Sequence, residues 1–148
     1  MAEFEASNPD YAALVARILG LQTFMVALGV RLDEVSPGRC TLALDCRPDH
    51  LQHGGSVHGG VLGALADNAA GAAAATLLPV GFAVVTVEYK INFLAPARGE
   101  RLLARAEVIR PGRAISVART DVFALAGERQ TLCATAMVTL SPMALPAA

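Results

Sequence analysis

The chain has 148 residues, of which 54% are hydrophobic and 17% are charged, and this length is typical of one domain with one core. Its formal net charge is −1, without the basic stripe that predicts binding to nucleic acid or to an anionic membrane surface. A chain with this many hydrophobic residues would expose much apolar surface as a monomer, so we expect a homo-oligomer.

The first eleven residues, MAEFEASNPDY, are acidic. They lack the basic stretch and apolar core of a secretory signal, so we expect a cytoplasmic protein. The three cysteines, Cys40, Cys46 and Cys133, include no CxxC pair. We expect them to be small, buried free thiols, and neither a disulfide framework nor a thiolate metal site is predicted.

The first third of the chain predicts a helix followed by a hairpin. Helical spacing covers 9–19 and ends at Gly20. Between 28 and 46, two strand-like runs flank Ser36-Pro37-Gly38, whose Pro and Gly suit a tight turn. Residues 47–60 are rich in histidine and turn formers and predict a loop.

A long helix is predicted over 59–78, where nearly every side chain is small or apolar and Pro79 follows as a stop signal. A helix that is apolar on all sides lies either inside a protein or in lipid. Asp67 and Asn68 fall in its middle, and a charge in hydrocarbon costs at least a few kcal/mol. We therefore expect this helix to be wrapped by protein and not to span a membrane.

Four runs with period-two alternation follow, which predict strands. They cover 82–94, 101–110, 114–125 and 130–140. In the first run the odd positions are apolar, and the polar side chains are expected to share the opposite face: Thr86, Glu88, Lys90 and Asn92. Short connections predict an antiparallel meander, and the tail 142–148 is expected to be frayed.

This order of elements indicates an α+β fold in one domain over 1–148, with an N-terminal helical segment over 1–27 and a core over 28–141. The sheet is expected to curl around the long helix, because the small side chains of the helix allow strands to approach closely on several sides.

Asp67 is the conspicuous polar residue of the long helix. A buried carboxylate is costly unless it is hydrogen-bonded or paired, and such positions concentrate raised pKa values and catalytic roles. From the residues alone two interpretations stay open: Asp67 is catalytic, or it satisfies nearby backbone amides.

His58-Gly59-Gly60 stands at the start of the same helix. Glycines there let a ligand approach the exposed N–H groups, and the helix dipole favours an oxyanion. An ordinary loop-to-helix junction is the alternative, in which His58 only orients the loop.

Metal and covalent chemistry have no support in the sequence. The spacing of His50, His53 and His58 fits no standard zinc pattern, so no metal site is predicted. There is no G-x-S-x-G elbow, and no cysteine adjoins a histidine in the sequence.

The segment QHGGSVHGG at 52–60, followed by Asp67-Asn68 and by TVEYKINFLAP at 86–96, resembles the phenylacetate-pathway (PaaI-like) branch of the hotdog acyl-CoA thioesterases. The resemblance runs from about Val30 to Leu140 and lies in the combination of HGG, an Asp nine residues after the His, the strand and its closing proline. It implies the hotdog fold, in which an antiparallel sheet wraps around one long central helix.

The resemblance also implies roles for four residues and places His58 beside one of them. Asp67 matches the family's general base or nucleophile, and the Gly59 N–H, beside His58, matches the group that polarises the thioester carbonyl. Thr86 falls where relatives hold the attacking water with Ser or Thr. Gln52 falls where many relatives have Asn, and it keeps an amide that is able to donate to the carbonyl.

Further residues are expected to contact the coenzyme A part of the substrate, and no separate cofactor is expected. They are Gly60, Asn68, Arg110, Gly112 and Arg113.

Gly59 and Asp67 are eight residues apart, about 12 Å along a helix at 1.5 Å per residue. Both must come within about 3 Å of one reacting centre. One helix cannot supply both, so we expect a dimer or tetramer with the active site at a subunit interface, where Gly59 of one chain faces Asp67 of the other.

The expected activity is hydrolysis of an acyl-CoA with an aromatic or medium-chain acyl group. Two alternatives stay open: a non-catalytic acyl-CoA-binding hotdog protein and a hotdog enoyl-CoA hydratase. Hydratases of this fold usually pair an Asp and a His a few residues apart on the central helix, whereas His58 precedes Asp67 by nine positions.

Overall fold

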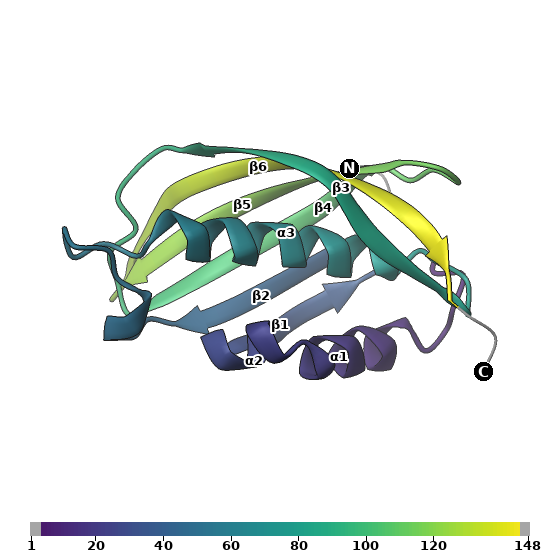
Figure 1. The fold of residues 1–148 in the computed structure, drawn as a ribbon, viewed down its shortest axis with the longest axis horizontal. Coiled ribbons are helices and arrows are strands. Elements are labelled where there is room, and N and C mark those ends of the chain that lie inside the picture. The colour runs from purple at the N-terminus through teal and green to yellow at the C-terminus, as the bar shows by residue number, and fades with distance from the viewer. Residues whose placement is uncertain (1–3, 146–148) are drawn as a thin grey trace.

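The computed structural model describes residues 4–145. Two helices, α1 and α2, come before the first strand, and the long helix α3 separates two strands from the last four (Figure 1). The elements are α1 (Tyr11–Leu21), α2 (Thr23–Leu28), β1 (Val30–Ser36), β2 (Arg39–Asp45), a 3₁₀ turn η1 (Pro48–His50), α3 (Gly59–Ala75), β3 (Phe82–Phe93), β4 (Arg101–Arg110), β5 (Ser116–Ala126) and β6 (Arg129–Ala144).

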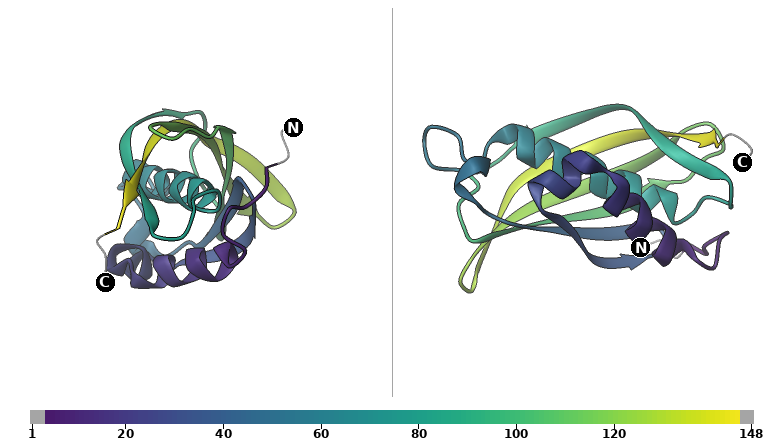
Figure 2. Two further views of the ribbon diagram at one scale, coloured as in Figure 1. Left: turned by 90° about the vertical axis from the view of Figure 1, so that its right-hand side faces the viewer. Right: turned by 60° about the horizontal axis from the view of Figure 1, so that its bottom comes forward.

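The strands form one six-stranded sheet in the order β1-β2-β4-β5-β6-β3, and every neighbouring pair is antiparallel. Viewed end-on, the sheet curves around α3, and α1 and α2 lie beside α3 along the open side of that curve (Figure 2). This is the α+β hotdog architecture that the sequence predicts.

Small side chains on α3 meet bulky side chains on the strands. Ala66, Ala69 and Ala70 have no exposed surface, and neither do Leu42 and Leu102 on the strands that pack against them. Because the helix contributes almost no side-chain volume, the leucines of the sheet fill the space around it at the density of a protein interior. The alanine-rich sequence of α3 is therefore a packing requirement of the fold.

The N-terminal segment differs from the prediction. Helix α1 continues past Gly20, and a second short helix, α2, covers the residues before the first strand. Gln22 has an extended backbone and separates the two helices. Gly29 ends α2 with a left-handed conformation at φ 82°, which glycine adopts without a steric penalty. The first strand therefore begins at Val30 instead of Leu28.

Helix α3 ends at Ala75, earlier than the predicted 78. The Thr76 hydroxyl donates to the Ala73 carbonyl at 2.6 Å and accepts from the Gly38 N–H at 2.7 Å. This buried hydroxyl joins the C-terminal end of α3 to the β1–β2 turn, which lies where the sequence predicts it.

The predicted meander holds for β4, β5 and β6 but not for β3, which lies at the far edge of the sheet and pairs with β6. Residues 94–100 carry the chain past the start of α3, where Val57 donates to the Ala97 carbonyl. Strand β6 extends to Ala144 because its residues 134–144 pair with β3. The expectation of a frayed tail is thus wrong for 142–144, and its last three residues lie outside the described residues.

The cysteines are free thiols, as expected. Cys40 and Cys133 are buried, but Cys46 is only half-buried, because it follows the end of β2, where the chain leaves the core. Burial raises the pKa of Cys40 to about 12, so this thiol stays protonated at neutral pH. Across residues 4–145, no helix has both the length and the hydropathy to cross a bilayer.

The Thr76 hydroxyl is expected to be a large single contribution to stability. Thr76→Val keeps the shape of the side chain but leaves the buried Gly38 N–H without its acceptor, so the free energy of unfolding should fall by about 1–3 kcal/mol. Urea denaturation measures this loss. Thr131→Val, at a half-exposed position of β6, is the matched control, and equal losses for both variants would contradict the role assigned to Thr76.

Candidate active site

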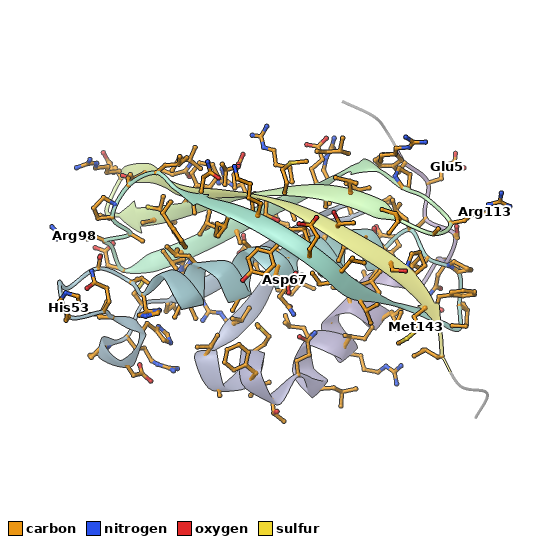
Figure 3. The ribbon with its side chains drawn as sticks, turned by 45° about the horizontal axis from the view of Figure 1, so that its top comes forward. Glu5, His53, Asp67, Arg98, Arg113 and Met143 are labelled. Atoms are coloured by element: carbon orange, nitrogen blue, oxygen red, sulfur yellow. The ribbon has the colours of Figure 1, made fainter. Side chains whose placement is uncertain are left out.

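Asp67 lies at the middle of α3, half-buried, with its side chain on the side of the helix that faces β3 (Figure 3). The Thr86 hydroxyl on β3 donates a hydrogen bond to Asp67 Oδ1 at 2.8 Å. Burial raises the pKa of the Asp67 carboxyl above its usual range, and the hydrogen bond from Thr86 opposes that shift. The result is a carboxylate that is more basic than an ordinary aspartate and is held by one neutral donor.

A β-bulge places Thr86 against Asp67. The register of β3 with β6 shifts between Thr86 and Glu88, so Val87 has no partner. Up to the bulge the even positions face α3, and beyond it Tyr89, whose hydroxyl lies over Gly63, faces the helix. The expectation that Thr86 shares a face with Glu88, Lys90 and Asn92 is therefore wrong, because the extra residue reverses the alternation.

Asn68 is tied to the N-terminal segment. Its Nδ2 donates to Gln22 Oε1 at 2.5 Å, at the break between α1 and α2. No feature of the sequence pointed to Gln22, since it lies in a segment with no strong pattern and its partner is 46 residues away. In this arrangement Asn68 binds Gln22, beside the carboxylate of Asp67.

The start of α3 is a capped helix end. His58 is exposed, and its Nδ1 accepts from the Gly60 N–H at 2.9 Å. The Gly60 N–H is thus already bound, whereas no group within residues 4–145 accepts from the Gly59 N–H. Of the two glycines, Gly59 has the N–H that is free to meet a ligand.

Close contact explains why residue 59 is a glycine. A Cβ at this position would lie 3.0 Å from Cζ of Phe93, whose ring covers the start of α3. Gly59 and Phe93 line a cavity of about 450 Å³ together with Gln52 and Pro96. The Gln52 amide donates to Ser56 Oγ at 2.7 Å and accepts from the Gly54 N–H at 2.6 Å, so it is fixed within its own loop.

The two sets of predicted catalytic residues lie in separate cavities. Asp67 and Thr86 line a cavity of about 330 Å³ between α1, α3 and β3, while Gly59 and Gln52 line the other. The spacing of about 12 Å along α3 is two turns of helix. A single chain does not bring these residues together.

Arg110, Gly112 and Arg113 lie at the other end of the molecule from the loop that precedes α3. Figure 3 shows Arg113 at one end and His53 at the other. The Val108 N–H donates to Gly38, whose own N–H binds Thr76 after α3, so the β4–β5 turn is near the C-terminal end of the helix. Within one chain these residues are not near Gly59.

Two of the three histidines, His50 and His58, accept backbone hydrogen bonds. His50 is buried and its Nδ1 accepts from the Arg47 N–H at 3.1 Å, and His58 caps α3. Over the described part of the chain, no three His, Cys, Asp or Glu side chains gather as metal ligands do.

A family model, the Thioesterase superfamily, matches residues 54–138, which include Gly59, Asp67 and Thr86. The chain belongs to the thioesterase superfamily. A thioesterase family protein from Silicibacter pomeroyi has a solved structure that is 38% identical with a TM-score of 0.89, over 90% of this chain and 98% of that one.

Two other solved structures extend this comparison. A thioesterase from Haemophilus influenzae is 26% identical with a TM-score of 0.80, over 99% of this chain and 95% of that one. A mutant of the phenylacetic acid degradation protein PaaI from Thermus thermophilus is 30% identical with a TM-score of 0.70, over 81% and 98%. At family level, these similarities support thioester hydrolysis.

The raised pKa of Asp67 predicts a pH-dependent stability for this thioesterase-family chain. The folded state disfavours the ionised carboxylate, so the contribution of Asp67 to stability is most favourable below the ordinary aspartate pKa of about 3.9 and is lost as pH rises through the raised value. Asp67→Asn has no charge and keeps an acceptor for Thr86. Its melting temperature should exceed that of the wild type at pH 7, and the difference should vanish near pH 3.

Thermal unfolding across this pH range measures the difference. Asp33→Asn, an exposed residue of β1, is the control and should show no such trend. If Asp67→Asn is less stable than the wild type at pH 7, contacts of the ionised carboxylate stabilise the fold by more than its burial destabilises it, which would contradict this account.

Proposed function

We propose that this thioesterase-family protein is an acyl-CoA thioesterase of the PaaI-like branch that releases free acid and coenzyme A. The observation that carries the proposal is the half-buried carboxylate of Asp67, which burial makes more basic and which Thr86 orients in a largely apolar cavity. A general base works best when its pKa approaches the working pH, and burial moves an aspartate in that direction.

In the proposed reaction, Asp67 takes a proton from a water molecule whose oxygen attacks the thioester carbonyl carbon. The Thr86 hydroxyl donates to Asp67 Oδ1, and its oxygen lone pairs accept a second hydrogen of that water. The tetrahedral intermediate then collapses, the C–S bond breaks, and the thiolate leaves and is protonated. Direct attack by Asp67, through an anhydride that water then hydrolyses, is the alternative route.

The Gly59 N–H is the proposed donor to the developing oxyanion. It is a free N–H at the positive end of α3, and glycine leaves room for the carbonyl beside Phe93. One such donor is typically worth about 3–4 kcal/mol of transition-state stabilisation. Gln52 lines the same cavity, and its Nε2 has a second hydrogen beyond the one bound to Ser56.

A dimer is the proposed way to join the two half-sites. Strand β3 is one of the two edge strands of the sheet, and Val85, Val87 and Phe93 on it are 42%, 56% and 57% exposed. An apolar edge strand is a template for pairing with another chain. If two copies of β3 pair antiparallel, the two α3 helices also run antiparallel, and Gly59 of one approaches Asp67 of the other.

The same arrangement gives Arg110, Gly112 and Arg113 a place in the site. They lie near the C-terminal end of α3, which antiparallel helices bring toward the Gly59 end of the neighbouring chain. The guanidinium groups then face the coenzyme A phosphates, for which arginine is well suited.

The residues of the site fit neither of the two alternative functions, a hydratase and a non-catalytic acyl-CoA-binding protein. A hydratase of this fold uses an Asp–His pair on the central helix, and α3 contains no histidine. A protein that only binds acyl-CoA has no use for a carboxylate whose ionisation burial disfavours, because that group lowers stability without adding contacts to a neutral thioester.

Release of free thiol from acyl-CoAs tests the proposed activity. Wild-type protein should release thiol from phenylacetyl-CoA or octanoyl-CoA, and Asp67→Asn should be slower by about 10²–10⁴-fold, the usual contribution of a general base. Asp33→Asn serves as the control. Hydration of an enoyl-CoA without thiol release would favour the hydratase, and undiminished hydrolysis by folded Asp67→Asn would exclude the mechanism.

Subunit complementation tests the shared site. Gly59→Val fills the approach to the carbonyl, and Asp67→Asn removes the base, so each homodimer should be inactive. A heterodimer isolated with two affinity tags has one site with both changes and one with neither, so it should recover about half of the wild-type activity. Recovery of no activity would place both residues of each site in one chain.

A further inference from the structure

The cavity that contains Asp67 extends beyond the carboxylate. It lies between α1, α3 and β3 and has a volume of about 330 Å³. Asp67 and Thr86 are at one end, and Ala75 lies eight residues further along α3, about 12 Å at 1.5 Å per residue. The cavity therefore forms a channel along the helix that begins at the proposed base.

The walls of this channel are apolar and come from one chain. Helix α1 contributes Val15, Ile18 and Leu19, and small residues of α3 form the side opposite. At Gly71 a Cβ would meet only Val84 Cγ2, at 3.7 Å, so this position leaves space inside the channel. An apolar ligand is bound here by removal of its surface from water.

Charge restricts the ligand further. Among residues 4–145, Asp67 is the one ionisable side chain that lines the channel, so this part of the chain places no cation there to receive an acyl group that carries a carboxylate. The amides of Gln22 and Asn68 bind each other at 2.5 Å, beside Asp67. Their hydrogen bond links the α1–α2 junction to α3 and holds α1 over the channel.

We propose that this channel binds the acyl group of the substrate in the subunit that supplies Asp67, with α1 as its outer wall. The inference rests on the proposed thioesterase function, since Asp67 and Thr86 line both the reaction site and the channel. A volume at the lower end of the range for ligand pockets, about 300–1,000 Å³, fits one aromatic ring or a medium-length alkyl chain. The substrate class is an uncharged aromatic or medium-chain acyl thioester, and long-chain and dicarboxylic acyl groups are excluded.

The first test is binding of S-alkyl-CoA thioethers, which have no carbonyl to hydrolyse, measured by titration calorimetry. Wild-type affinity should rise from butyl to octyl and rise no further to hexadecyl. Ala75→Leu fills the far end of the channel and should weaken octyl binding at least about tenfold with butyl binding unchanged. Gly71→Ala adds one methyl group without a clash and should act in the same direction more weakly.

A variant with the opposite effect and a control complete the series. Ile18→Ala opens the α1 wall and should raise the affinity for hexadecyl-CoA relative to octyl-CoA. Ala16→Leu makes the same change as Ala75→Leu on the exposed face of α1 and should change neither. Equal effects of the two leucine variants, or wild-type affinity that does not depend on alkyl length, would overturn the proposal.

The outcomes separate this inference from the function on which it rests. If the channel variants change the thioether affinities as predicted but the protein releases no thiol from acyl-CoAs, the channel is supported as a binding site and the thioesterase function is rejected. Hydrolysis that depends on Asp67, with chain-length preference unchanged in Gly71→Ala, Ala75→Leu and Ile18→Ala, would retain the enzyme and place the acyl group elsewhere.

Discussion

The rest of this structure depends on one constraint, which is that the carboxylate of Asp67 lies on a helix enclosed by the curved sheet. The sheet closes around α3 because the helix has almost no side-chain bulk, and Asp67 is the only ionisable residue of that helix. Burial disfavours its charge, so the fold must supply a polar partner. The bulge in β3 does so by turning Thr86 toward the helix. A local irregularity of one strand thus produces a basic, oriented carboxylate in an otherwise apolar interior.

The same constraint shapes the rest of the site. A helix that positions Asp67 at its middle and Gly59 at its start holds the proposed base and the proposed oxyanion donor about two turns apart. The free edge of β3, with its exposed valines, lies beside both half-sites. In the proposed enzyme, the site is complete only when a second copy of the chain supplies the missing half. Catalysis by the proposed enzyme therefore requires assembly of two subunits. Burial of the Asp67 carboxylate, which the proposed reaction needs, lowers the stability of each subunit.

Much of the fold followed from the sequence because hydrophobic periodicity and small-residue content reflect packing directly. The long helix, the strands and the position of Asp67 are of this kind. Three features were not predictable from pattern. The edge position of β3 depends on the path of 94–100, the contact of Thr86 depends on an unpaired Val87, and the bond from Gln22 to Asn68 joins segments far apart in sequence. Each is a tertiary effect that leaves no local periodicity.

The most direct measurement is a crystal structure of the protein with an acyl-CoA analogue in which a ketone replaces the thioester. The ketone oxygen should lie within about 3 Å of the Gly59 nitrogen of one subunit, with its carbon facing the Asp67 carboxylate of the other. The alkyl group should extend along α3 of the subunit that supplies Asp67. A ligand contacted by Gly59 and Asp67 of the same chain, or one bound far from Asp67, would contradict the proposed site.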